Sequence, residues 1–335
     1  MDRKYLLRVL SGVSPKKMFD VIDRIHEKTG KSKAYLFFDI VNCAVRYGAG
    51  YYDYLIFAFY DMNKEQRKTY VTRVINKKLI SMMNDDNYSY VFDSKNVFNK
   101  RFQRYLKRDY LDVETATAEQ FHEFIQNKEI VFAKPNTGVS GWGIEKLKVS
   151  DFENEDKMFS YIKEKDFGVL EEQLVQHEVL SKLYPLSINS LRIVTIVVNR
   201  EAHVVYVTAK MGSDGKFVDN LESGGLCCPV DVKTGKIYGV AHTSKLVTYE
   251  KHPDTGIKFD GYQLPFIKEA MELCKEAAME VDEIRFVGWD VCITKDGPAI
   301  IEGNDYPGYD FWQLPEHTPD KIGLLPYYKK LLPEL

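Results

Sequence analysis

The chain has 335 residues, of which 44% are hydrophobic and 28% charged, a composition typical of a globular protein with two or three packed subdomains. Its formal net charge of -3 argues against a nucleic-acid-binding protein and against attachment to an anionic membrane through a basic segment. The longest apolar runs, Tyr54–Tyr60 and Ile193–Val198, are too short to span a bilayer, and the charged N-terminus lacks the apolar segment of a secretory signal. Five cysteines without metal-ligand spacing indicate a reduced, cytoplasmic protein.

Helical patterns fill the first quarter of the chain. Ser14 followed by Pro15, then Ser32, and then Asn63 each precede an amphipathic stretch, as N-cap residues do. The cluster of Asn and Asp at 84–87 is typical of a boundary. We therefore expect a helical region at residues 1–87, without a catalytic cluster, and a second domain at residues 88–335.

Strand and helix patterns alternate from residue 88 onward. The predicted helices are 98–107, 118–126, 154–164 and 265–280. The predicted strands are 129–134 and 168–175, together with two hairpins formed by 191–198 with 203–211 and by 230–232 with 236–241.

A predicted hairpin at residues 288–304 carries acidic side chains on one face. Residues 295–297 suit a three-residue loop, because Gly297 can adopt the left-handed backbone conformation that such a loop requires. That loop places Asp290 opposite Glu302, and Asn304 shares their strand face. Opposed carboxylates repel each other, so we expect a cation between them. Two carboxylates and one carboxamide are oxygen ligands suited to Mg²⁺, especially to Mg²⁺ shared with phosphates.

A strand ending in Lys134 leads into a loop with three glycines. Glycines let backbone N–H groups close around phosphate oxygens, and hydroxyl side chains add hydrogen-bond donors. Taken alone, this loop is better explained as an ordinary surface turn beside a lysine, and it lacks the ending of a Walker A loop. The candidate phosphate-binding residues are Lys134, Thr137, Gly138, Ser140, Gly141 and Gly143.

Four further features have both a functional and a structural explanation. Lys95, at the start of a predicted helix, is typical of a solvated side chain. The segment 171–178 follows a strand and offers edge amides and carbonyls to a planar base, although in isolation a charged strand end explains it. Arg192 and Lys210 lie in mostly apolar strands and need anionic partners, which either a ligand or buried ion pairs would provide.

The order of these motifs, from about residue 95 to residue 309, resembles the ATP-grasp superfamily. The most specific elements are Asp290 with Glu302-Gly303-Asn304, Lys134-Pro135-Asn136 with its glycine loop, and Glu171 with Glu178 at a spacing of seven residues. The chain looks like the sugar-transfer-associated branch, because of segments 217–225 and 230–235 and of Tyr51-Tyr52-Asp53-Tyr54 in the helical region. The implied fold is α+β, with an N-terminal helical region and two α/β subdomains, at about 88–175 and 176–335, that clamp ATP between antiparallel sheets.

The resemblance implies a role for each candidate residue. Lys95, Lys134 and the glycine loop would bind the phosphates of ATP. The adenine would meet Glu171 and the backbone of Gln173 and Leu174, and Glu178 would hold the ribose. The ligands of Mg²⁺, with Mn²⁺ as an alternative metal, would be Asp290, Glu302 and Asn304. Arg192 and Lys210 would contact the γ-phosphate or an acyl phosphate.

One position departs from the pattern. Many amino-acid ligases of the superfamily have an arginine two residues before the metal-binding aspartate, where it stabilises the tetrahedral oxyanion, and this chain has Gly288 there. The role then passes to Arg192, to Lys210 or to backbone N–H groups, or the chemistry differs.

The implied reaction joins a small-molecule carboxylate to an amine or another nucleophile through an acyl phosphate. The branch suggests a cell-surface polysaccharide precursor or another sugar conjugate as substrate. The alternatives are a phosphotransferase acting on a hydroxyl and a nucleotide-binding module without turnover, and a homodimer is left open. The predicted acceptor site consists of Asn220, Ser223, Gly224, Gly225, His242, Tyr306 and Gly308. A hairpin-end structural role is the better explanation of His242, and core packing explains Tyr306, Tyr309 and Trp312 as well as sugar stacking does.

Overall fold

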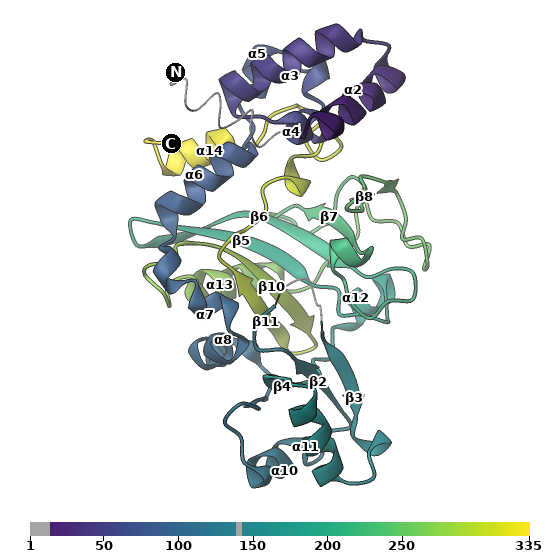
Figure 1. Cartoon of the computed structure of the whole chain (residues 1–335), viewed down its shortest axis with the longest axis vertical. Helices are drawn as coiled ribbons and strands as arrows, with labels where there is room; N and C mark the ends of the chain where they lie inside the picture. Colours follow the sequence, from purple (N-terminus) through teal and green to yellow (C-terminus); the bar gives the residue numbers. More distant parts are fainter. Residues whose placement is uncertain (1–13, 139–142) are drawn as a thin grey trace. The chain divides into compact units, whose positions relative to one another are not determined.

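The computed structural model of the chain, shown in Figure 1, describes residues 14–138 and 143–335. Two of the predicted phosphate-binding residues, Ser140 and Gly141, therefore lie outside the described residues. The chain forms two compact units, one made of Met1–Met82 with Gly308–Leu335 and the other of Met83–Pro307. We call them the helical unit and the sheet unit. This division differs from the prediction, which assigned residues 308–335 to the second domain.

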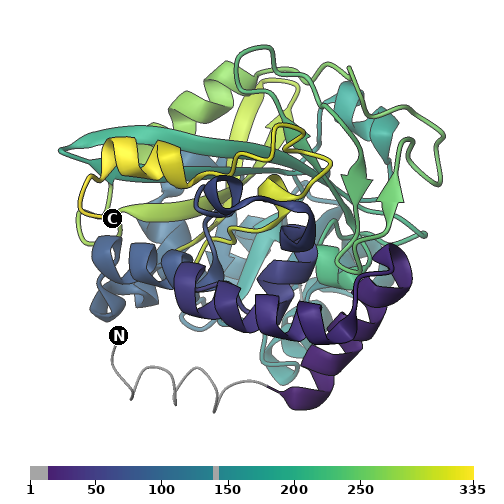
Figure 2. The same ribbon diagram turned by 90° about the horizontal axis from the view of Figure 1, so that it is seen from above.

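In the helical unit, side-chain caps set the starts of the two longest helices. Ser14 and Ser32 accept hydrogen bonds from the backbone N–H groups of Lys17 and Tyr35, and left-handed Gly30 ends the first helix. The two long helices, α2 and α3, lie side by side (Figure 1 and Figure 2). The elements of the unit are α2 (Pro15–Thr29), α3 (Lys33–Tyr47), α4 (Tyr51–Ile56), η1 (Phe59–Asp61), α5 (Lys64–Arg67), α6 (Arg73–Met83, which continues into the sheet unit), η5 (Phe311–Gln313) and α14 (Leu325–Leu331).

A buried glutamine explains why the C-terminal segment belongs to the helical unit. The amide group of Gln313, which is fully buried, donates to the carbonyl of Val71 at 3.0 Å and accepts from the N–H of Val71 at 2.9 Å. It also accepts from the N–H of Leu324 at 3.0 Å. These bonds satisfy backbone groups that would otherwise be buried without partners. The sequence contains no local pattern that predicts this pairing.

The sheet unit contains two antiparallel sheets. The four-stranded sheet has the order β1-β4-β2-β3, and the seven-stranded sheet has the order β11-β10-β5-β6-β7-β8-β9. The strands are β1 (Tyr110–Asp112), β2 (Ile130–Lys134), β3 (Glu145–Lys148), β4 (Val169–Glu172), β5 (Leu191–Val198), β6 (Glu201–Met211), β7 (Leu226–Val230), β8 (Ala241–His242), β9 (Thr248–Tyr249), β10 (Phe286–Thr294) and β11 (Gly297–Asn304).

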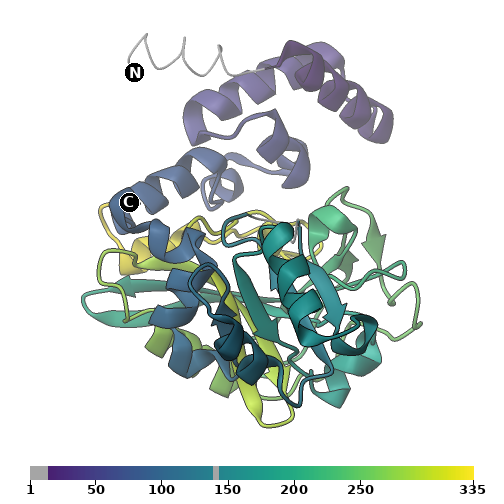
Figure 3. The same ribbon diagram turned by 60° about the horizontal axis from the view of Figure 1, so that its bottom comes forward.

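Helices cover both sheets of this unit. Helices α10 and α11 share a hydrophobic core with the four-stranded sheet (Figure 3). A larger core on the seven-stranded sheet includes fully buried Trp289, whose indole N–H donates to Thr195 Oγ1 at 2.9 Å. The helices of the unit are η2 (Asp86–Tyr88), α7 (Tyr90–Asp93), α8 (Lys95–Arg101), α9 (Gln103–Leu106), α10 (Ala118–Ile125), η3 (Val149–Asp151), α11 (Glu155–Glu164), α12 (Glu178–Leu183), η4 (Leu221–Ser223) and α13 (Ile267–Ala277).

Most predicted elements are present with shifted ends. The predicted helix 98–107 is divided into α8 and α9, and the predicted strand 168–175 ends at Glu172. The predicted hairpin 230–232 with 236–241 reduces to one bridge between Val230 and Ile237. The β5–β6 turn is shorter than predicted, because Asn199 and Arg200 both adopt positive φ angles, of 52° and 63°, as a two-residue turn requires.

Within the described residues, no helix is both long enough and apolar enough to cross a membrane.

Candidate functional site

The predicted opposition of Asp290 and Glu302 is present, and a β-bulge produces it. The ladder pairs Thr294 with Gly297, so the loop has two residues and not the predicted three. Between Asp290 and Val291 the register shifts by one residue, because Ile301 has no partner on β10. The loop is one residue shorter than predicted, and the bulge adds one residue to β11. These two differences cancel, so Asp290 still lies opposite Glu302.

Asp290 lies between two cations. Arg192, directly opposite on β5, donates from Nε to Asp290 Oδ1 at 2.5 Å and from Nη2 to Oδ2 at 3.1 Å. Lys210 Nζ on β6 lies 2.7 Å from the same Oδ2. Burial alone would raise the pKa of Asp290, but the two cations outweigh it and hold the pKa well below its usual range. The buried ion pairs that the sequence left open for Arg192 and Lys210 are therefore real.

Glu302 is different, because it makes no hydrogen bond or ion pair with another described residue. Solvent reaches its side chain, yet the surrounding protein atoms reduce its hydration and this raises its pKa. The negative charge of Asp290 raises the pKa further, whereas Lys210, Lys134 and Arg192 act in the opposite direction. Glu302 is thus a carboxylate with free oxygens in a strongly charged setting.

The donor set fits a hard divalent cation. Among the residues that the structure describes, Glu302 has both oxygens free, and Asn304 Oδ1 accepts only one hydrogen bond, from the N–H of Tyr306 at 2.8 Å. Asp290 retains less capacity, since three of its lone-pair positions face Arg192 and Lys210. No group of three or more His, Cys, Asp and Glu side chains that could hold a metal occurs among residues 14–138 and 143–335. A metal here would therefore need the carboxamide of Asn304 in addition to the two carboxylates.

Lys134 is held by Glu171, and Glu171 by Arg108. Lys134 Nζ lies 2.6 Å from Glu171 Oε2, and Arg108 Nη2 lies 3.0 Å from Glu171 Oε1. Asn99 of α8 also donates to Oε1, at 3.0 Å. Burial alone would raise the pKa of Glu171, but Arg108 and Lys134 outweigh it and lower the pKa well below its usual range. The side chain predicted to meet adenine is thus already saturated with protein partners.

Lys95 starts α8 and contacts the glycine loop. Its Nζ donates to the carbonyl of Gly138 at 3.1 Å, and its backbone N–H donates to the carbonyl of Asn136 at 2.9 Å. Burial lowers the pKa of Lys95, which Glu302 partly offsets. Gly143 needs to be glycine, because it has a φ of 74° and a Cβ would lie 2.9 Å from Pro135 Cγ. Thr137 is exposed beside them.

The segment after β4 presents a free backbone edge. Among the described residues, the N–H and C=O groups of Gln173 and Leu174 make no hydrogen bond, and the next bridge joins Gln176 to Thr294. Glu178 is exposed at the first turn of α12. The segment therefore has the open amides and carbonyls that recognition of a planar base requires.

The predicted acceptor residues divide into two groups. In the segment 217–225, Asn220 caps η4 by accepting from the N–H of Glu222 at 3.1 Å, and Ser223 and Gly224 follow directly. Gly225 packs so tightly that a Cβ would lie 2.3 Å from the carbonyl oxygen of Asp219. His242 is buried on β8, opposite Cys227.

The second group belongs to two different units. Tyr306 is exposed in the sheet unit, whereas Gly308 belongs to the helical unit. Tyr309, next to Gly308, packs on Phe57 and donates to Asp53 Oδ1 at 2.7 Å. Of the two roles considered for Tyr309, the structure therefore shows the packing role.

Two residues near the site were not identified from the sequence. Asp219 Oδ2 accepts from the N–H and Oγ of Ser190, at 3.0 and 2.5 Å, and its Oδ1 lies 3.9 Å from Lys210 Nζ. Arg108 pairs with Glu171 from a Lys-Arg-Asp triplet that resembles a solvated loop. Asp219 could have been identified from its place in the segment 217–225, whereas no local sequence pattern marks Arg108.

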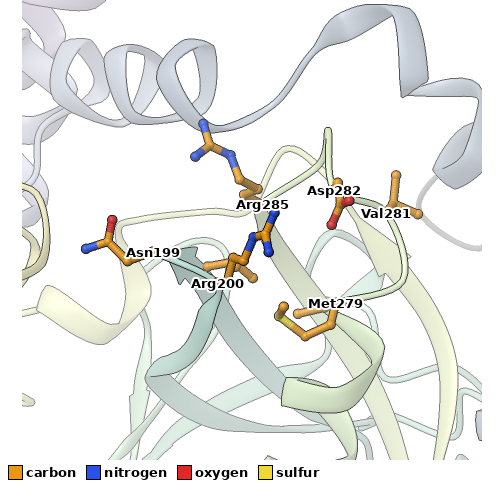
Figure 4. A pocket seen from close by; sticks show the side chains of 8 residues that line it. Asn199, Arg200, Met279, Val281, Asp282 and Arg285 are labelled. Atoms are coloured by element: carbon orange, nitrogen blue, oxygen red, sulfur yellow. The ribbon is translucent and has the colours of Figure 1, made fainter.

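A pocket of about 380 Å³ lies elsewhere in the sheet unit (Figure 4). It is lined at the β5–β6 turn by Val197, Asn199 and Arg200, and by residues between α13 and β10. Because Arg192 is near the other end of β5, this pocket is separate from the carboxylate site. It contains none of the predicted site residues.

Comparisons with known proteins found similar solved structures and a matching family. Similar folds include the ATP-grasp ligase PsnB complexed with minimal precursor (14% identity, TM-score 0.44, 76% of this chain and 64% of that chain). Others are D-alanine–D-alanine ligase from Helicobacter pylori (13%, 0.43, 77% and 69%) and N5-carboxyaminoimidazole ribonucleotide synthetase in its ADP complex (15%, 0.39, 65% and 46%). The chain thus spans roughly half to two thirds of the length of these structures.

No curated protein matches the chain. The model of the family described as "Sugar-transfer associated ATP-grasp" matches residues 74–321, which is most of the chain. The two antiparallel sheets, the mixed α+β architecture and the N-terminal helices agree with the fold implied by the resemblance. The chain belongs to the sugar-transfer-associated ATP-grasp family.

Proposed function

We propose that this protein is an ATP- and Mg²⁺-dependent ligase that joins a carboxylate to an amine or another nucleophile through an acyl phosphate. One observation carries the proposal. Four cations act on the single carboxylate of Glu302, namely Lys95 and Lys134 near the four-stranded sheet and Arg192 and Lys210 on the seven-stranded sheet. Such an excess of positive charge around two opposed carboxylates suits a polyphosphate bound together with a divalent cation.

Each residue has a defined part in the proposed site. Lys95, Lys134 and the glycine loop bind the phosphates, and the free backbone edge at Gln173 and Leu174 receives the adenine. Glu178 is placed for the ribose. Glu302, Asn304 and the remaining capacity of Asp290 hold Mg²⁺, which neutralises phosphate charge when bound, with Mn²⁺ as a substitute. Both oxygens of Glu171 already have protein partners, so its part is to position Lys134. Adenine is then recognised by the backbone.

The reaction has two steps in this proposal. An oxygen of the substrate carboxylate attacks the γ-phosphorus, the bond to the ADP oxygen breaks, and ADP leaves. A nitrogen or another nucleophile then attacks the acyl carbon, the bond to the phosphate oxygen breaks, and the proton of the nucleophile passes to the departing inorganic phosphate. Arg192 and Lys210 stabilise the negative charge that develops on the phosphoryl and acyl oxygens.

The position of Arg192 supports the ligase over the phosphotransferase alternative. A Cβ at Gly288 would lie 3.3 Å from Arg192 Nη1, so a guanidinium from β5 lies beside the position where related ligases place their arginine. The oxyanion-stabilising charge is therefore available from another strand. This removes the main reason, the glycine itself, for favouring phosphate transfer to a hydroxyl.

The experiment is hydroxylamine trapping with ATP, Mg²⁺ and a panel of carboxylates, including sugar acids. We expect a hydroxamate with one class of carboxylate, and a loss of at least about 10²-fold in its formation rate for Glu302→Ala. Control variant Glu201→Ala, an exposed residue at the far end of β6, should retain the rate. Phosphorylation of a hydroxyl without hydroxamate would favour the phosphotransferase, and ATP binding without any turnover would favour a binding module.

The pathway is part of the proposal. The family is named for its association with sugar transfer, and we infer that the acceptor is a cell-surface polysaccharide precursor or a related sugar conjugate. The acceptor-site candidates in the sheet unit are Asn220, Ser223, Gly224, Gly225, His242 and Tyr306. Asn220→Ala should raise the KM for the sugar substrate more than the KM for ATP.

A further inference from the structure

Arg108 is a buried arginine with four hydrogen-bonded or ionic contacts. It lies between α9 and β1, and only 2% of its side chain is exposed. Nη1 donates to the carbonyl of Ile300 at 2.7 Å, and Nη2 donates to the carbonyl of Ile301 at 2.9 Å. Nη2 also reaches Glu171 Oε1 at 3.0 Å and, more weakly, Asn99 Oδ1 at 3.4 Å. Nε is buried without a hydrogen-bond partner among the described residues, so the burial is not fully compensated.

The two carbonyl contacts fall on the bulge of β11. Ile301 is the residue without a partner on β10, and Ile300 is the last residue paired before the register shifts. A bulge interrupts the ladder and leaves backbone groups that need other partners. Arg108 supplies those partners from outside the hairpin. The bulge in turn sets Asp290 opposite Glu302, so the guanidinium stabilises the register on which the metal ligands depend.

The carboxylate contact falls on the residue that holds Lys134. Glu171 has one negative charge and two cationic partners, Arg108 and Lys134. Because Arg108 neutralises this carboxylate from one side, Lys134 keeps part of its positive charge for a phosphate. Removal of Arg108 would leave Glu171 and Lys134 as a closed ion pair with no excess charge.

We propose that Arg108 is a positioning residue that links the metal-binding hairpin to the phosphate-binding lysine. It acts through the bulge on Asp290 and Glu302, and through Glu171 on Lys134. The proposal rests on the proposed function, since it assumes that these groups bind Mg²⁺ and phosphate. It adds a residue that contacts neither ligand and yet sets the affinity for both.

The test uses Arg108→Met, Arg108→Lys and the control Arg67→Met in the full chain. Arg67 is a comparable buried arginine in the helical unit, where it bonds to Asp39 and to the carbonyl of Phe59. Binding of Mn²⁺ in the presence of a non-hydrolysable ATP analogue is measured by electron paramagnetic resonance, and binding of the analogue without metal by calorimetry. Thermal unfolding of each variant fixes the temperature at which all of them are folded.

Arg108→Met should weaken Mn²⁺ binding at least tenfold and metal-free nucleotide binding several-fold. Arg67→Met should change neither by more than twofold, although both variants lower the Tm. Arg108→Lys keeps the positive charge but cannot bond to both carbonyls as the guanidinium does. Compared with Arg108→Met, it should therefore restore nucleotide binding more than Mn²⁺ binding. The double variant Arg108→Met/Glu171→Gln removes the charge imbalance and should still bind Mn²⁺ weakly, because the bulge remains unsupported.

Wild-type affinity for Mn²⁺ in Arg108→Met, at a temperature where it is folded, would overturn the proposal. Full recovery in the double variant would also overturn the part that acts through the bulge. If the wild type itself binds no metal–nucleotide complex, the proposed function fails, and hydrogen exchange then tests the link to the hairpin. Amides of residues 297–304 should exchange at least tenfold faster in Arg108→Met than in Arg67→Met, and equal rates would reject Arg108 as a support of the bulge.

Discussion

Arg192 occupies the space that Gly288 leaves free. A Cβ at residue 288 would lie 3.2 Å from Arg192 Cδ and 3.2 Å from Pro307 Cβ. These separations are shorter than ordinary van der Waals contacts, so a side chain at residue 288 would have to displace the arginine. The glycine that departs from the ligase pattern is therefore the residue that lets Arg192 reach Asp290.

Gly288→Ala tests this relationship. We expect Arg192 to shift by a few tenths of an ångström, kcat to fall about tenfold, and the KM for ATP to stay within twofold, since misplacement of a charged group affects the transition state most. Steady-state kinetics with the carboxylate found by hydroxylamine trapping provide the measurement. Gly50→Ala is the control, because a Cβ there meets no atom within 4 Å. Equal kcat values in the two variants would mean that the space beside Gly288 is not needed.

Asp290→Asn should separate metal binding from charge balance. The substitution leaves Arg192 and Lys210 without their carboxylate, which we expect to cost about 3 kcal/mol of unfolding free energy in the ligand-free protein. Mn²⁺ affinity should fall at least tenfold. Metal-free nucleotide affinity should stay the same or rise, because the two cations are then available to phosphates. Urea unfolding and calorimetric titration measure these effects, and a loss of nucleotide affinity would contradict this assignment.

Glu171→Gln should be destabilising, with a defined pH dependence. The variant leaves Arg108 and Lys134 buried without a negative partner, at a cost of about 3–5 kcal/mol. The pKa of Glu171 is depressed in the folded protein, so its contribution is complete above the unfolded pKa and declines as the pH falls below about 4.5. The stability difference between wild type and variant, measured by urea unfolding, should therefore shrink on acidification. A difference that grows would show that the carboxylate is not stabilised by the two cations.

Asp53 predicts the opposite trend for the helical unit. Burial raises its pKa to about 6, although Tyr309, Arg73 and Gly50 donate hydrogen bonds to it. An acid with a raised folded-state pKa retains its proton in the folded state, so stability falls as the pH rises from about 4 to 6, by roughly 3 kcal/mol at most. Asp53→Asn should remove this dependence. Urea unfolding of the wild type and the variant between pH 4 and 7 is the measurement, and an unchanged slope in the variant would disprove the assignment.

Local patterns were sufficient to predict the N-caps of the first two helices and the face of the acidic hairpin. Ser14 and Ser32 form the expected N-caps, and the alternation of side chains in the segment 288–304 places Asp290 and Glu302 opposite each other. The prediction of the loop was wrong by one residue. The bulge at Ile301 adds one residue and so preserves the register at the carboxylates. The alternation of side chains alone does not predict such a bulge.

Long-range contacts account for what could not be predicted. Arg108 lies in a short polar segment that resembles a solvated loop, and Gln313 is a lone polar residue between Trp312 and Leu314, yet both are buried by partners far away in the sequence. Their roles depend on which backbone groups the folded chain leaves without partners, and a single sequence does not show that. The ion pair of Glu171 was missed for the same reason, because its cationic partner Arg108 precedes it by a long stretch of chain.

The chain order of the two units has a practical consequence. Since residues 14–82 and 308–335 both belong to the helical unit, the sheet unit is an insertion between Met82 and Gly308. The Nδ2 group of Asn84 donates to the carbonyl of Asp305 at 2.6 Å, so the residues that enter and leave the insertion are neighbours. An excised fragment should therefore run from Met83 to Pro307. A fragment continued to Leu335 would retain Gln313 without the backbone of Val71 that satisfies its amide, and would expose the apolar face of α14 as a site of aggregation.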